Sequence, residues 1–150
     1  MLNYPIRVLF LCTGNSARSQ IAEGFLRDIG GKDFSAFSAG SAPKGMHPMT
    51  VKVMAEHHID VSNQQSQHIS EFINQHFDYI ITVCDRAKDT CPVFPGDNKQ
   101  IHWSYPDPAA EEGEEEQLHV FRQTALEMRE RIRAWVETQR KLLKEQGVAG

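Results

Sequence analysis

Residues 8–19 of this 150-residue chain read Val8-Leu9-Phe10-Leu11-Cys12-Thr13-Gly14-Asn15-Ser16-Ala17-Arg18-Ser19, a run that predicts both a strand and the loop after it. The apolar run that begins it is short and is followed by a glycine, which favours a buried strand over a helix. From about residue 17 to residue 29, apolar side chains recur at helical spacing. Cys12 and Arg18 therefore stand at the two ends of a loop between a strand and a helix.

A Cys-x5-Arg loop in this position suits a tetrahedral oxyanion. Successive backbone N–H groups converge on one point there, and the positive end of the helix dipole faces it. Arg18 adds a planar fork for two anion oxygens, and Gly14 permits unusual backbone angles. The positive surroundings favour a reactive Cys12 thiolate. The alternative is that both residues have only structural roles, Cys12 as a small buried side chain and Arg18 as a surface residue of the helix. We predict an oxyanion site on the loop: Thr13, Gly14, Asn15, Ser16, Ala17, Arg18 and Ser19.

The rest of the chain alternates strands with helices. Further strands are expected at 34–39, 78–83 and 99–103, and helices from Pro48, from Ser70 through Phe77, and from about Glu114 onward. This order is typical of parallel pairing with helices on both faces. The prediction is an α/β fold with a four-stranded parallel sheet, built as one domain over residues 1–150.

Composition excludes several classes of protein. Hydrophobic residues make up 40% of the chain and the net charge is −4, so we expect a globular protein that binds no nucleic acid. No apolar run is long enough for a membrane span, and the N-terminus lacks the features of a signal peptide. We therefore expect a cytoplasmic protein with reactive or reduced cysteines, and its modest size and charged final helix favour a monomer.

The segment from Val8 through Arg18 and Ser19 to Gly24 resembles the signature of the low-molecular-weight protein tyrosine phosphatase fold. Within that fold it is most similar to the thioredoxin-coupled arsenate reductases, from about residue 6 to the final helix. The resemblance implies that Asp107, in an Asp-Pro loop, is the general acid; by spacing alone it would be an ordinary turn residue. Ala109 and Ala110 follow it and suit a small inorganic anion better than a phosphotyrosine ring.

Two further cysteines follow the third predicted strand. Cys84 ends that strand, at the edge where Cys12 ends the first strand, so the two can approach one another. A helix from Cys84 to Cys91 would separate their sulfurs by roughly 10 Å, whereas a disulfide needs Cα atoms within about 7 Å. Pairing therefore predicts that this segment bends or partly unfolds. The alternative is two separate buried thiols. The segment 82–96 is similar to the redox segment of the arsenate reductases.

Metal ions and cofactors are not expected. The cysteines and the seven histidines lack the short ligand spacing of zinc sites. Some members of the resembled family bind potassium, and the matching positions here are Asn15, Glu23, Ser38, Gln65 and Gln67. Glutamines replace a threonine and an aspartate at the last two, which weakens a site for a hard cation. The acidic tract 111–116 is interpreted as a solvated loop and first helical turn, with a docking patch for a basic partner as the alternative.

The resemblance implies reduction of arsenate to arsenite by a three-cysteine relay. Cys12 would attack arsenic, Cys84 would attack Cys12 and release arsenite, and Cys91 would then form a Cys84–Cys91 disulfide for thioredoxin to reduce. The alternative is a low-molecular-weight protein tyrosine phosphatase with a cysteinyl-phosphate intermediate. A non-enzymatic thiol sensor that binds an oxyanion is a third possibility.

Overall fold

A parallel sheet forms the centre of the computed structural model, which describes residues 3–147. The strands are β1 (Ile6–Cys12), β2 (Phe34–Gly40), β3 (Tyr79–Thr82) and β4 (Lys99–His102). They lie in the order β2-β1-β3-β4, and every neighbouring pair is parallel. The predicted four-stranded parallel sheet is confirmed. The predicted domain also included residues 1–2 and 148–150, which lie outside the described residues.

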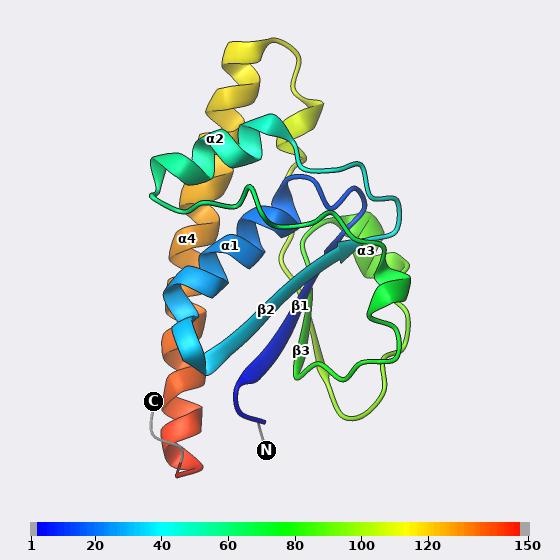
Figure 1. Cartoon of the computed structure of the whole chain (residues 1–150), viewed down its shortest axis with the longest axis vertical. Coiled ribbons are helices and arrows are strands. Elements are labelled where there is room, and N and C mark those ends of the chain that lie inside the picture. Colours follow the sequence, from blue (N-terminus) through cyan, green and yellow to red (C-terminus); the bar gives the residue numbers. More distant parts are fainter. Residues whose placement is uncertain (1–2, 148–150) are drawn as a thin grey trace.

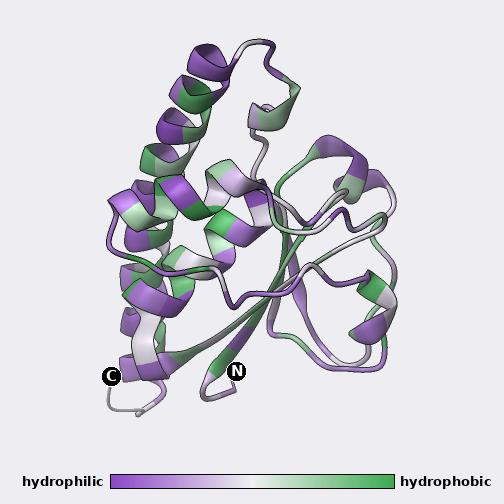
Figure 2. Ribbon diagram, turned by 45° about the horizontal axis from the view of Figure 1, so that its top comes forward, coloured by the Kyte–Doolittle hydropathy of each residue, from purple (hydrophilic) through white to green (hydrophobic). Residues whose placement is uncertain are grey.

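The two long helices cover one face of the sheet (Figure 1). They are α1 (Arg18–Gly30) and α4 (Glu114–Glu145), with α2 (Pro48–Glu56) packed against both. Trp135 of α4 meets the rings of Phe34, Tyr79 and Trp103 at centroid distances of 5.8, 5.0 and 6.1 Å. Apolar and polar turns alternate along α4 in Figure 2, as expected of a helix with one face on a core.

The opposite face of the sheet is covered by shorter elements between residues 69 and 94. Phe37 of β2 packs edge-on against Phe72 and Phe77, and Phe77 meets Phe94. This part of the chain contains the 3-10 turn η2 (Ile69–Glu71) and the short helix α3 (Asp85–Asp89). The long helices therefore lie on one face of the sheet, whereas the other face has short helical segments and aromatic side chains from irregular backbone.

The predicted helix from Ser70 through Phe77 is wrong. The structure has a single 3-10 turn, and His68 rather than Ser70 is its N-cap. The His68 Nδ1 accepts from the backbone N–H of Ser70, and the Glu71 carboxylate accepts from the backbone N–H of His68. These two reciprocal bonds satisfy one turn only, and the following residues instead place Phe72 and Phe77 in the core.

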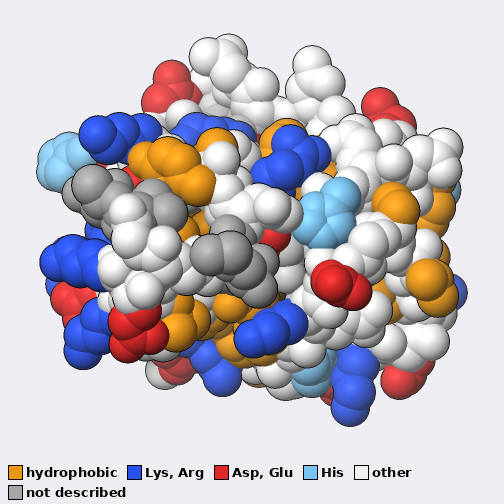
Figure 3. Space-filling view, turned by 90° about the horizontal axis from the view of Figure 1, so that it is seen from below, with side chains coloured by type: hydrophobic (Ala, Val, Ile, Leu, Met, Phe, Trp, Pro, Cys, Tyr) orange, Lys and Arg blue, Asp and Glu red, His pale blue; other side chains and the backbone are white. Residues whose placement is uncertain are grey.

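The carboxyl ends of β1 and β3 lie side by side and carry two of the cysteines. Leu11 pairs with Thr82, and the N–H of Val83 donates to the carbonyl of Leu11 at 2.9 Å. Cys12 and Cys84 follow at this edge. The opposite end of the molecule, seen from below in Figure 3, shows acidic and basic side chains interspersed. None of the helices within residues 3–147 is long and apolar enough to cross a membrane.

Candidate active site

The loop between β1 and α1 is held from outside by the segment 42–47. Backbone N–H groups of Ala42, Lys44 and His47 donate to the carbonyls of Thr13, Gly14 and Ser16, at 2.9, 2.9 and 3.0 Å. In a planar trans peptide the carbonyl and the following N–H point in opposite directions. The amides of Gly14, Asn15 and Ala17 therefore face inward, toward the space beside Cys12.

Asn15, rather than Gly14, has the left-handed backbone in this loop. Its φ is 45°, whereas Gly14 is absent from the residues with positive φ. Asparagine tolerates this region better than most side chains, and Asn15 is fully buried. The prediction that Gly14 supplies the unusual angle is wrong. Its missing side chain matters sterically instead, because the Lys44 side chain lies 3.3 Å from where a Cβ would stand.

A glycine at the end of β2 makes room for the loop. A Cβ on Gly40 would lie 2.4 Å from the carbonyl oxygen of Thr13, and 3.0 Å from the backbone nitrogen of Asn15. These are backbone atoms and have little freedom to move away. Gly40 therefore allows β2 and the loop to approach more closely than any other residue would permit.

Cys12 is 4% exposed and lies at the centre of this loop. Its Sγ is 2.8 Å from the Ser19 Oγ and accepts from the backbone N–H of Asn15 at 3.2 Å. These two contacts hold the sulfur in place at the mouth of the helix. Helix α1 begins at Arg18 and has no acidic residue in its first turn, so the positive end of its dipole is unopposed there. The sulfur is thus placed to attack a group bound in the loop.

Arg18 and Asp107 complete one wall of the site. The Arg18 side chain is 14% exposed, and its guanidinium donates to the carbonyl of Tyr105 at 3.0 Å and lies 3.9 Å from Asp107 Oδ2. Asp107 is 44% exposed and accepts from the N–H of Ala109 at 3.0 Å. That bond caps the turn η3 (Pro108–Ala110) and fixes the direction of the carboxyl group. The placement agrees with the predicted role of Asp107 as a proton donor, which stays a prediction.

These groups line one cavity of about 510 Å³. Its lining includes Cys12, most of the predicted oxyanion loop, Arg18 and Asp107. It also includes residues that the sequence did not assign to the site, namely Lys44, Gly45, Met46, His47 and Pro48. Pro48 was recognised as a helix start, but no sequence pattern placed the preceding loop over the anion site, since that depends on how β2 and α2 are joined in space.

Cys84 lies beside the loop but does not line the cavity. It is buried, and its Sγ is 3.6 Å from the Thr13 Oγ1. Cys91 is half-buried at the far side of α3, with its Sγ 3.6 Å from the carbonyl of Pro92. All three cysteines are free thiols. The structure brings Cys84 to the loop that holds Cys12 and does not contain the predicted Cys84–Cys91 bond. The movement of the segment between these two cysteines stays a prediction.

The positions considered for potassium form a hydrogen-bonded group beside the loop. Asn15, Glu23 and Ser38 are joined directly, the N–H of Gln67 donates to Asn15 Oδ1 at 2.8 Å, and the carbonyl of Gln65 accepts from Gln20 at 2.9 Å. Within residues 3–147, no group of three or more His, Cys, Asp or Glu side chains is arranged to hold a metal ion.

The geometry agrees with comparisons to known proteins. The model of the low molecular weight phosphotyrosine protein phosphatase family matches residues 7–148. The chain belongs to this family. An arsenate reductase of Oceanobacillus iheyensis is 42% identical over 132 residues, which cover 87% of this chain and 95% of that protein. The chain thus belongs with the arsenate reductases of the family.

Solved structures give the same result. An arsenate reductase in an oxidized state superposes with a TM-score of 0.75 and 28% identity, covering 88% of this chain and 97% of that one. A thioredoxin-dependent arsenate reductase of Corynebacterium glutamicum superposes with a TM-score of 0.67 and 27% identity, covering 89% of this chain and 63% of that one. The predicted fold and family are confirmed.

Proposed function

We propose that this chain reduces arsenate to arsenite and is regenerated by thioredoxin. One observation supports this most directly: a second buried thiol, Cys84, lies against the loop that surrounds Cys12. Hydrolysis of a phosphate ester uses one thiolate, an arginine and an acid, so Cys84 has no part in it. Reduction of an oxyanion by two electrons needs a second thiol, because two thiols release two electrons when they form a disulfide. The relatives named arsenate reductase support the same choice.

The first step is nucleophilic attack at arsenic. Arsenate binds on the inward amides of the loop and the Arg18 guanidinium. The Cys12 thiolate forms a sulfur–arsenic bond, and one oxygen leaves as water with a proton from Asp107. Arsenic is still pentavalent at this point, because no electrons have been transferred.

Reduction occurs when Cys84 attacks Cys12. A Cys12–Cys84 disulfide forms, the sulfur–arsenic bond breaks, and its electron pair stays on arsenic, which leaves as trivalent arsenite. Cys91 then attacks Cys84, which frees Cys12 and moves the disulfide to Cys84–Cys91. The dithiol of thioredoxin reduces that bond. The two electrons gained by arsenic therefore come from thioredoxin, and the relay would operate in a reducing cytoplasm.

A coupled assay tests the proposal. NADPH, thioredoxin reductase and thioredoxin are mixed with the protein, and the reaction is started with arsenate. We expect NADPH oxidation that depends on arsenate and on the protein, with arsenite as product. A parallel assay measures hydrolysis of an aryl phosphate. Rapid aryl phosphate hydrolysis without arsenate-dependent NADPH oxidation would instead identify a phosphatase. Binding of an oxyanion in the absence of both activities would identify a thiol sensor.

A further inference from the structure

Arg27 lies on α1 one turn after Glu23, and its guanidinium joins three parts of the fold. It forms an ion pair with Glu23, donates to the carbonyl of Ala36 on β2 at 3.3 Å, and donates to Gln64 Oε1 at 2.8 Å. The Glu23 side chain is 8% exposed, whereas that of Arg27 is 54% exposed. The guanidinium therefore closes, from the solvent side, over a carboxylate that the fold has removed from water.

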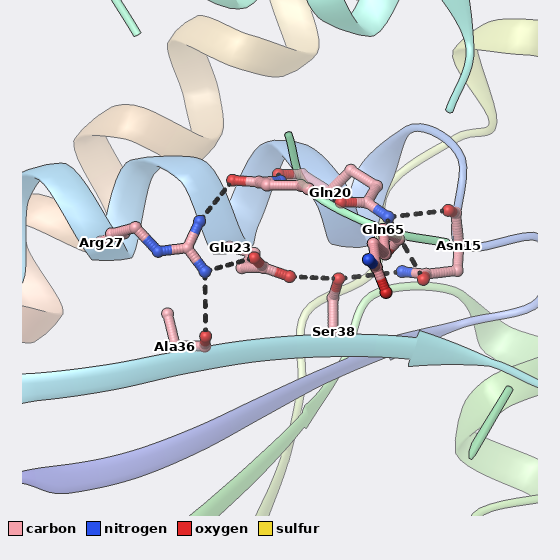
Figure 4. Close-up of polar contacts among 8 residues, drawn as sticks. Asn15, Gln20, Glu23, Arg27, Ala36, Ser38 and Gln65 are labelled. Carbon is pink, nitrogen blue, oxygen red and sulfur yellow. Dashed lines mark hydrogen bonds and ion pairs between the residues drawn. The ribbon is translucent and has the colours of Figure 1, made fainter. Parts of the chain in front are cut away.

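From Glu23, hydrogen bonds run to the anion loop (Figure 4). The Ser38 hydroxyl donates to Glu23 Oε1 at 2.6 Å, and its oxygen accepts from Asn15 Nδ2 at 3.0 Å. The same Asn15 amide donates to Ser19 Oγ at 2.8 Å, and Ser19 lies 2.8 Å from the Cys12 sulfur. An unbroken series of polar contacts thus links the Arg27–Glu23 pair to Cys12.

A second series starts from the same guanidinium. Gln64, which accepts from Arg27, donates from its Nε2 to Gln20 Oε1 at 2.8 Å. Gln20 in turn donates to the backbone carbonyl of Asn15 at 3.0 Å and to its Oδ1 at 3.2 Å. Both series end on Asn15, the buried residue with left-handed backbone whose N–H donates to the Cys12 sulfur.

Arg27 compensates the negative charge of the buried Glu23 side chain. A buried carboxylate is costly unless a cation and hydrogen bonds compensate it, and within residues 3–147 the ion pairs give Glu23 no basic partner other than Arg27. Without that cation, Glu23 would place an uncompensated negative charge two hydrogen bonds from Asn15. Such a charge disfavours a thiolate and an oxyanion in the neighbouring loop.

We propose that Arg27 is a positioning residue for the Cys12 nucleophile. It neutralises Glu23 and, through Ser38 on one side and Gln64 and Gln20 on the other, holds Asn15 in the conformation that serves Cys12. The inference rests on the proposed role of Cys12 as the nucleophile, and it deepens that role. An exposed i, i+4 ion pair contributes little by itself; the buried partner and the two converging series distinguish this pair from an ordinary one.

The test compares four variants by the rate at which iodoacetamide alkylates Cys12 at neutral pH, followed by peptide mass spectrometry. Arg27→Gln removes the cation, and Arg27→Lys keeps it without the planar fork. Glu23→Gln combined with Arg27→Gln removes both charges but leaves an oxygen to accept from Ser38. Arg122→Gln is the matched control, because it breaks another half-exposed ion pair, with Glu56, away from the loop. Thermal unfolding of each variant is measured alongside.

We expect Arg27→Gln to slow alkylation of Cys12 roughly tenfold, as for loss of a charge-assisted hydrogen bond. Arg27→Lys should recover part of the rate, and the double variant should be faster than Arg27→Gln alone. Arg122→Gln should alkylate at the wild-type rate. Three results would overturn the inference. Arg27→Gln could alkylate at the wild-type rate, Arg122→Gln could slow by the same factor, or the double variant could be as slow as Arg27→Gln.

The measurement is independent of arsenate reduction. Alkylation of Cys12 needs neither arsenate nor thioredoxin, so a chain that fails the coupled assay would defeat the proposed function and leave the role of Arg27 open to this test. If the coupled assay succeeds and Arg27→Gln reacts and turns over like the wild type, the positioning role alone is wrong.

Discussion

The hydroxyl of Thr13, the residue after Cys12, lies 3.6 Å from the sulfur of Cys84. Cys12 and Cys84, 72 positions apart in the chain, are thus both next to Thr13, one by sequence and the other by contact. The cause is topological: β1 and β3 are parallel neighbours, Cys12 is the last residue of β1, and Cys84 comes just after the end of β3. Cys91 lies beyond α3, and its Sγ is 3.6 Å from the carbonyl of Pro92.

This arrangement predicts a divided response to mutation of the cysteines. Cys91→Ser should release about one equivalent of arsenite per protein molecule and then stop, because the Cys12–Cys84 disulfide cannot be passed on; such a burst is the usual sign of a blocked later step. Cys12→Ser should release none. Rapid-quench measurement of arsenite checks both. Sustained turnover of Cys91→Ser with thioredoxin would contradict the relay.

Ser19 gives a second prediction. Ser19→Ala removes the hydroxyl that lies 2.8 Å from the Cys12 sulfur, and the loss of a hydrogen bond to a charged group should lower the alkylation rate of Cys12 and the turnover number roughly tenfold. Ser62→Ala is the control, since the Ser62 hydroxyl donates to the exposed Asp60 carboxylate at 2.6 Å. Equal rates in the two variants would show that Ser19 does not serve the thiolate.

Gly40 gives a prediction about packing. Gly40→Ala forces a Cβ against the carbonyl oxygen of Thr13, so β2 or the loop must shift. We expect a loss of about 1–3 kcal/mol in the free energy of unfolding, the usual cost of overpacking. We also expect a lower rate of arsenate reduction, because the loop that holds Cys12 must shift. Gly14→Ala is the comparison for stability, because its nearest neighbour is the flexible Lys44 side chain at 3.3 Å. Urea denaturation measures both, and equal stability of the two variants would refute the steric argument.

Cys91 gives a prediction about pH. Burial raises the pKa of the Cys91 thiol above its ordinary value, because the charged form is poorly solvated. In a Cys12→Ser/Cys84→Ser background, alkylation of Cys91 should therefore remain slow at neutral pH and rise only at pH values above those at which a free cysteine reacts. Mass spectrometry across alkaline pH tests this. A midpoint at or below that of a model thiol would show that Cys91 is already solvated in the reduced state.

The sequence predicted the parts of the site that local chemistry specifies. A strand, a Cys-x5-Arg loop and a helix must follow one another for the backbone amides to converge, so Cys12, Arg18 and Ser19 were recognised from spacing alone. The position of Cys84 followed from the general rule that parallel strands end at one edge. Asp107 needed the family resemblance, because an Asp-Pro turn by itself has many uses.

The support of the loop depends on how distant parts of the chain pack together. The segment 42–47 and Gly40 contact the loop from parts of the chain that follow α1, and Glu23 reaches it through Ser38 of β2. No pattern in a single sequence records which carbonyl a distant amide will meet, or that the left-handed residue is Asn15 rather than Gly14. Residue type and spacing fixed the chemistry that the chain can perform, whereas the packing of β2, α1 and α2 around the loop determined which side chains hold that chemistry in place.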